Sequence, residues 1–313
     1  MLGACNMGNR AKWLIAAAIG TTMLAAPATA TQWGSYHWAN NGTGVTLHIQ
    51  NTFRTAADWT TWYGQAKTDW GKTSNTNVTL IEDGAWAGTT SKKCDPISGE
   101  ILVCSDAYGQ RGWLGIATIW ANGDHITQAT TKLNDSYFSF AYYNTDGWRD
   151  LVACQEIGHD FGLDHQDETF DNVNLGTCMD YTNAPDGGTV NNFNYGVPNR
   201  APNSDDYATL TSDAMYGSGH SDSGGGGGGG CNPHKPGCTG GQSDAFTFRE
   251  VGKSPASDSS ASVADSGQWG RAIAYDRAGR PDTFMLDLGN GHRKLTHVFW
   301  VPGYRPVPAN MHD

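Results

Sequence analysis

The chain has 313 residues, of which 38% are hydrophobic, 11% aromatic and only 16% charged. A chain of this length can bury one substantial core and a second small one. Acidic residues outnumber basic ones by 31 to 20, and the formal net charge is -11. Because such a chain repels a polyanion, we do not expect nucleic acid as a partner.

The first thirty residues have the organisation of an export signal. Arg10 and Lys12 precede an apolar stretch, residues 13–26, and residues 28–30 have the small-x-small form of a cleavage site. The apolar stretch is too short, and too interrupted by glycine and threonine, for a membrane span. We therefore expect a signal peptide over residues 1–30, no membrane span, and a secreted, extracellular protein.

Cysteine usage agrees with export. Six of the seven cysteines lie beyond the expected signal peptide, and an even number suits an oxidising compartment. A structural zinc ion on thiolates is the alternative, but no C-x-x-C pair occurs. The clustering of the six suggests three local disulfides: Cys94 with Cys104, Cys154 with Cys178, and Cys231 with Cys238.

Apolar periodicity predicts the elements of the first two thirds of the chain. Residues 59–70 carry aromatic side chains at helical spacing, which predicts an amphipathic helix with its aromatic stripe in the core. A second helix is expected over 146–161, ending near Gly162. Strands surrounding two long helices imply an α/β domain. The remaining expectations are strands at 45–49, 78–81, 113–120 and 125–133, a disulfide-stapled loop at 94–104, a long loop at 182–202 and a last helix at 205–216.

A run of seven glycines, residues 224–230, predicts a flexible linker. We therefore expect one domain over 31–220, a Gly-rich linker over 221–230, and a small all-β region over 231–313. In that last region three alternating stretches, 271–276, 282–288 and 293–301, predict an antiparallel meander. The region carries no recognisable chemistry, and the candidate partners for it are a surface, a carbohydrate or the first domain.

The segment Q-E-I-G-H-D-F-G-L-D-H carries the candidate chemistry. Residues four apart share a helix face, so Gln155 and His159 point the same way and Glu156 lies beside them. Gly162 permits a sharp turn that brings His165 back toward the other two. Three metal ligands and a carboxylate base can therefore meet at one place.

This segment resembles the extended zinc signature H-E-x-x-H-x-x-G-x-x-H of the metzincin peptidases, with Gln155 where the first His belongs. Downstream, Cys178-Met179-Asp180-Tyr181 resembles the Met-turn of that family. The segment at 202–210 is similar to one that closes bacterial matrixin-like domains. The resemblance covers roughly residues 31–220 and implies a twisted mixed sheet with an active-site helix.

The resemblance implies a secreted zinc endopeptidase. One Zn²⁺ would be held by Gln155, His159 and His165, with Met179 beneath it, and Glu156 would act as general base on the attacking water. The Tyr181 hydroxyl is a candidate for stabilising the oxyanion. The substrate would be a protein or a peptide.

Gln155 keeps two further interpretations open. One is an impaired metzincin-fold binding protein, because an amide oxygen is a poorer zinc donor than imidazole. The other is that a different side chain completes the metal site, for which the candidates are His125, Asp160 and Asp164.

The remaining polar residues have ordinary interpretations. No G-x-S-x-G, Walker or dinucleotide motif occurs. An acidic stretch after the signature could hold Ca²⁺, but its spacing fits no EF-hand and a solvated loop is the expectation; its members are Asp167, Glu168, Asp171, Asn172 and Asn174. The histidines without ligand spacing are expected to be surface or core residues: His37, His48, His220, His234, His292 and His297.

Overall fold

The computed structural model describes residues 31–40, 42–55, 59–222 and 269–304. The expected signal peptide, the glycine run and the expected Cys231–Cys238 disulfide lie outside these residues. Of the helices in the described ranges, none combines the length and the apolar character that a membrane crossing requires.

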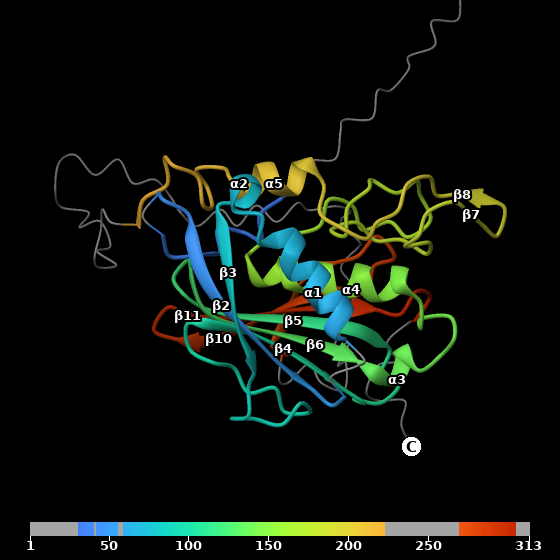
Figure 1. Ribbon diagram of the computed structural model, residues 1–313, viewed down its shortest axis with the longest axis horizontal. Helices are drawn as coiled ribbons and strands as arrows, with labels where there is room; N and C mark the ends of the chain where they lie inside the picture. The colour runs from blue at the N-terminus through green and yellow to red at the C-terminus, as the bar shows by residue number, and fades with distance from the viewer. Residues whose placement is uncertain (1–30, 41, 56–58, 223–268, 305–313) are drawn as a thin grey trace, which may run out of the picture.

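A mixed sheet forms the centre of the described structure, with strand order β3-β2-β4-β6-β5-β11-β10-β9 and the short β1 beside β6 (Figure 1). Strands β2, β3, β4 and β6 run parallel, whereas β5 is antiparallel to both of its neighbours. The fold is therefore α/β with a large mixed sheet, as the sequence predicts. The strands are β1 (His37–Trp38), β2 (Val45–Phe53), β3 (Val78–Ala85), β4 (Glu100–Asp106), β5 (Trp113–Asn122), β6 (His125–Asn134), β9 (Arg271–Tyr275), β10 (Pro281–Gly289) and β11 (His292–Trp300).

The alternation in β2 is the kind that a half-buried strand requires, because Val45, Leu47 and Ile49 are buried and the residues between them are exposed. The expectation of a loop throughout 94–104 is wrong at its end, because β4 begins at Glu100 and contains Cys104. Strand β4 is buried on both faces, so it reads as a continuous apolar run without the alternation that identifies β2.

Helices α1 (Thr60–Trp70) and α4 (Asp146–Asp160) pack against each other on one face of the sheet (Figure 1). The Thr145 hydroxyl accepts a hydrogen bond from the backbone N–H of Trp148 and so caps the start of α4. Almost every residue of α4 is buried, because the sheet lies below it, α1 lies beside it and loops cover it. The short helices are α2 (Thr73–Thr76) and α3 (Asp135–Phe138), and two-residue strands β7 (Thr189–Val190) and β8 (Phe193–Asn194) lie within the expected long loop.

The last helix of this part, α5 (Ser204–Leu210), is shorter than the expected 205–216. Asn203 and Asp206 form a capping box at its start. At its end the Thr211 hydroxyl donates to the Tyr207 carbonyl, and such side-chain bonds compete with continued helix.

The three strands after the glycine run form the antiparallel meander that the sequence predicts, but they extend the main sheet. Strand β11 pairs with β5 from His292 opposite Asn122 to Trp300 opposite Trp113. Leu295 on this strand is fully buried in the same apolar core as helix α4. The pattern of a strand does not reveal which strand it pairs with, so the sequence could not place the meander on this sheet.

Candidate metal centre

Helix α4 and the turn after it position the signature residues. Gln155, Glu156 and His159 are fully or almost fully buried. The turn uses Gly162 in a left-handed conformation with φ of 92°. A Cβ atom on this glycine would lie 2.1 Å from the Tyr36 carbonyl oxygen, so only glycine allows the chain to turn here toward His165.

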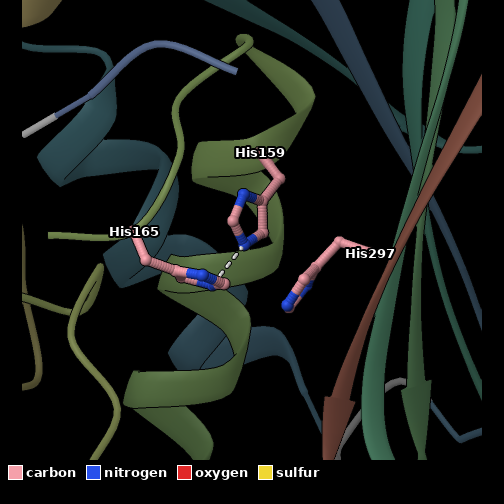
Figure 2. A group of neighbouring side chains, drawn as sticks. All are labelled: His159, His165 and His297. Carbon is pink, nitrogen blue, oxygen red and sulfur yellow. Dashed lines mark hydrogen bonds between the residues drawn. The ribbon is translucent and has the colours of Figure 1, made fainter. Parts of the chain in front are cut away.

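Three histidines converge beside this turn: His159 from α4, His165 from the segment after it, and His297 from β11 (Figure 2). Each offers one ring nitrogen, and these three nitrogens lie within 4.8 Å of one another. His297 is 1% exposed. It is a residue that the sequence analysis treats as ordinary, yet the structure places it with the two signature histidines.

Hydrogen bonds at the far side of two rings fix which nitrogen can bind a cation. Nδ1 of His159 lies 2.8 Å from the Leu163 carbonyl, to which it donates. Nδ1 of His165 lies 3.5 Å from a Glu168 carboxylate oxygen. Each ring, when it is neutral, therefore holds its lone pair on Nε2. These two Nε2 atoms lie 3.1 Å apart, and two facing lone pairs require a proton or a metal ion between them.

His297 connects the group to two other residues of the signature region. Its Nδ1 lies 3.2 Å from a carboxylate oxygen of Glu156, and its Nε2 lies 2.8 Å from the hydroxyl of Tyr181. With Nδ1 donating to the carboxylate, Nε2 accepts from the Tyr181 hydroxyl, and a cation would need the same lone pair. The Tyr181 hydroxyl also lies 3.3 Å from Asp282 on β10.

Gln155 is not part of this group. Its Nε2 donates to the Cys178 carbonyl at 2.7 Å, and its Oε1 is buried with no hydrogen-bond partner in the described part of the chain. This hydrogen bond ties α4 to the segment that contains Met179. The disulfide Cys154–Cys178, which the sequence predicts, joins the same two segments; the predicted Cys94–Cys104 disulfide is also present.

Met179 packs against helix α4 at Gly158. A Cβ atom on Gly158 would lie 2.6 Å from the Met179 sulfur, so glycine in α4 allows this close approach. The Thr177 hydroxyl accepts from the Met179 N–H and holds the turn. The methionine therefore lies directly against the helix that carries His159.

The other candidates for completing the site lie elsewhere. His125 belongs to a second group of residues, with His37 and Asp222. A carboxylate oxygen of Asp160 accepts from the Thr131 hydroxyl. Asp164 lies 3.9 Å from Nδ1 of His165, on the side of the ring away from His159.

The acidic stretch after the signature is mostly used by the loop itself. Asp167 accepts from the Thr169 N–H, and Asn174 donates to two backbone carbonyls. Of the acidic stretch, only Glu168 belongs to a group of described residues that could hold a metal ion. The other members of that group are Asp164 and His165. The arrangement supplies no separate reason to expect Ca²⁺.

Burial determines the protonation states of the group. It raises the pKa of Glu156 well above its usual range, and the nearby charge of Asp160 adds to this rise. It also lowers the pKa values of His159 and His297 well below the usual range, with neighbouring histidines lowering them further. These two rings are therefore neutral near pH 7, which is the state that binds a metal ion, whereas at His165 the lowering by burial is outweighed by the nearby Glu168 carboxylate and the pKa is raised.

Gly115 on β5 makes room for the base. A Cβ atom at this position would lie 2.7 Å from Cγ and 2.8 Å from Oε1 of Glu156. Oε1 is buried and has no hydrogen-bond partner among the described residues. The helix and the strand together therefore hold one carboxylate oxygen against His297 and leave the other unsatisfied.

A cavity of about 890 Å³ shares one residue, Glu168, with the contacts of the histidine group. Its lining includes Glu168 and Phe170 from the loop after the signature, and Arg280 and Tyr304 from the tail. Glu168 faces both this cavity and His165. The histidines themselves are covered, at 1% to 7% exposed.

No family model matches the chain, and no match was found among curated proteins. The site must therefore be argued from its own geometry. One sequence signal for the missed residue does exist, because Leu295, His297 and Phe299 alternate on the buried face of β11. A histidine on an apolar strand face is more often a core residue, and that signal alone does not identify a ligand.

Proposed function

We propose that the protein is a secreted, zinc-dependent endopeptidase of the metzincin type, with His159, His165 and His297 as the zinc ligands and Glu156 as the general base. The observation that carries the proposal is the 3.1 Å between Nε2 of His159 and Nε2 of His165, with His297 and Glu156 beside them. The family signature has its first histidine at the position of Gln155. In this proposal His297 of the tail takes the place of that ligand.

The donor set fits zinc. Imidazole nitrogen suits Zn²⁺, and three protein ligands with an open fourth position are typical of catalytic zinc sites. Zn–N bonds of about 2.0–2.1 Å in a tetrahedral site place two ligand nitrogens about 3.3 Å apart. The 3.1 Å between His159 and His165 is close to that value. The bonds from the far nitrogens to Leu163 and Glu168 are the outer partners that orient such ligands.

Peptide hydrolysis follows from this group together with Glu156. A zinc ion held there would polarise the scissile carbonyl and lower the pKa of a water molecule toward about 7. Glu156 takes the proton from the attacking water and passes it to the leaving amine, for which a raised pKa is needed. The Tyr181 hydroxyl, which lies beside His297, is the candidate to stabilise the oxyanion.

Burial of the group favours a second candidate function. Glu156 is 0% exposed and His297 is 1% exposed, because the tail strands cover the site. A substrate can reach the group only when β10 and β11 move relative to the loop at Glu168. If they do not move, the same residues form a structural metal site in a binding protein.

Cleavage of unstructured protein by the purified full chain distinguishes an endopeptidase from a binding protein with a structural metal site. Casein and a mixture of synthetic peptides are incubated with the wild type and with Glu156→Gln, and products are identified by mass spectrometry. We expect cleavage by the wild type, no cleavage above background by Glu156→Gln, and equal zinc content in both. Zinc in both with cleavage by neither would establish the binding protein, and no zinc at the three histidines would refute both.

A further inference from the structure

A second cluster of histidines lies at the opposite end of α4 from the capped N-terminus, where three segments far apart in the chain meet. His37 comes from β1, His125 from the start of β6, and His220 and Asp222 from the segment after α5. One ligand atom from each of His37, His125 and Asp222 lies within 4.8 Å of the others. His220 packs edge-on against His37 with ring centroids 4.6 Å apart.

All three histidines point at one carboxylate oxygen. Oδ1 of Asp222 lies 3.0 Å from Nε2 of His125, 3.1 Å from Nε2 of His220 and 3.4 Å from Nε2 of His37. The other oxygen, Oδ2, accepts from the Asn40 N–H at 2.7 Å and so fixes the carboxylate. Three imidazole rings surround one oxygen, although one positive charge would be enough to neutralise the carboxylate.

The far nitrogens again fix the tautomers. Nδ1 of His37 lies 2.8 Å from the Ser35 carbonyl, and Nδ1 of His220 lies 2.8 Å from the Asp213 carbonyl. A carbonyl only accepts, so both Nδ1 atoms carry hydrogen and both Nε2 atoms hold lone pairs in the neutral rings. Those lone pairs face a carboxylate oxygen, which also only accepts. The cluster is complete only when a cation lies among these atoms.

A metal ion fits better than protons. Satisfying the oxygen with protons alone would place two imidazolium groups, His37 and His220, in ring contact beside one carboxylate, with His125 donating from a neutral ring. One divalent ion would satisfy His37, His125 and Asp222, whose ligand atoms all lie within 4.8 Å of one another, and His220 lies 3.1 Å from the same Asp222 oxygen. The oxygen–nitrogen spacings of 3.0 to 3.4 Å agree with the roughly 3.3 Å between ligand atoms in a tetrahedral zinc site. The ring of His37 and the carboxylate are 7% and 15% exposed, whereas the ring of His125 is 43% exposed and lies at the open side of the cluster.

We propose that His37, His125 and Asp222, with His220 as the fourth ligand to be tested, form a second binding site for a divalent transition metal ion, for which Zn²⁺ is the best match. With His220 bound as well, four protein ligands would leave no open position, which is the property of a structural site. A bound ion would hold three segments together: β1, the start of β6 and the segment after α5. The proposal does not depend on the first site being catalytic.

Metal content of the full-length chain tests it. The purified wild type is loaded with ZnCl₂, desalted and measured by elemental analysis beside His125→Gln and His220→Gln. His159→Ala removes the first site, and His48→Gln is the matched control, because His48 is a partly exposed histidine outside both clusters. Unfolding temperature is measured for each with and without a chelator, so that loss of fold is detected.

We expect about two zinc ions per chain in the wild type and in His48→Gln, and about one in His125→Gln, His220→Gln and His159→Ala. The unfolding temperature of His125→Gln should also respond less to the chelator than that of the wild type. Equal zinc content in the wild type, His125→Gln and His220→Gln would overturn the proposal, and the cluster would then be a protonated ion pair with Asp222. Because His159→Ala is measured separately, failure of either site is recognised without the other.

Discussion

Nδ1 of His297 lies 3.2 Å from a carboxylate oxygen of Glu156. This contact joins the strand after the glycine run to the helix that carries the signature. Both residues are buried, so each restricts where the other can lie. The tail is therefore part of the candidate site, and the site cannot be complete without it.

Replacing His297 should remove the central metal ion. We expect His297→Ala to lower zinc affinity at this site by more than about 100-fold, because the loss of a ligand exceeds the effect of losing an outer partner. Zinc content is measured after dialysis against a weak chelator. His292→Ala, at an exposed histidine on the same strand, is the control and should keep its zinc. Unchanged zinc content in His297→Ala would show that the tail histidine is not a ligand.

A histidine at position 155 should compensate for that loss. Residue 155 lies one turn before His159 on the same helix, and its side chain now donates to the Cys178 carbonyl. We expect Gln155→His in the His297→Ala background to recover part of the zinc affinity, while Gln155→Ala alone changes it little. Isothermal titration with Zn²⁺ measures all four proteins. If Gln155→Ala alone loses the ion, Gln155 takes part in binding and the proposed ligand set fails.

The signature residues could be predicted from sequence because their relation is local. His159, Gly162 and His165 lie within two turns of chain, and the spacing alone brings the two histidines together. The predicted strands and the two long helices depend on similarly local apolar periods. Strand β4 lacked such a period, since it is buried on both faces.

The partner of these histidines could not be predicted in the same way. His297 reaches them only because β11 pairs with β5, and pairing between distant strands leaves no local pattern. The same holds for the second group, in which His37 meets His125 because β1 pairs with β6, and Asp222 reaches both from the segment after α5. Both candidate metal groups therefore depend on long-range contacts, which leave no local pattern in the sequence.

A methyl group at position 115 should displace the base without removing the metal ligands. A Cβ atom there would lie 2.7 Å from Cγ of Glu156 and 2.8 Å from Val152. We expect Gly115→Ala to cost about 1–3 kcal/mol in the free energy of unfolding and to lower peptidase activity while zinc content stays unchanged. Urea unfolding and the cleavage assay measure the two effects.

Gly64 provides the matched control. It lies inside α1, and a Cβ atom there would contact nothing within 4 Å. We expect Gly64→Ala to stabilise the protein by about 0.5–1 kcal/mol, because alanine loses less conformational entropy in a helix. Equal stabilities for the two alanine variants would contradict the close packing at Gly115.

The stability of the metal-free protein should depend on pH through Asp180. Burial raises the pKa of this carboxyl to about 7, although the Leu175 N–H and Asn199 donate to it and oppose the rise. A carboxyl with a raised pKa binds its proton more tightly in the folded state than in the unfolded chain, where its pKa is about 3.9. Folding stability is therefore lost as pH rises from about 4 to about 7.

Asp180→Asn removes this titration. The free energy of unfolding of the variant, relative to that of the wild type, should therefore rise across the same pH window. The gain is at most about 4 kcal/mol, because one pKa unit corresponds to about 1.36 kcal/mol. Urea unfolding from pH 4 to pH 8 measures it, with a chelator present because a bound cation lowers the pKa of nearby carboxyl groups. Asp95→Asn, at an exposed carboxylate, is the control. A difference between Asp180→Asn and the wild type that is constant across this range would mean that Asp180 does not titrate there.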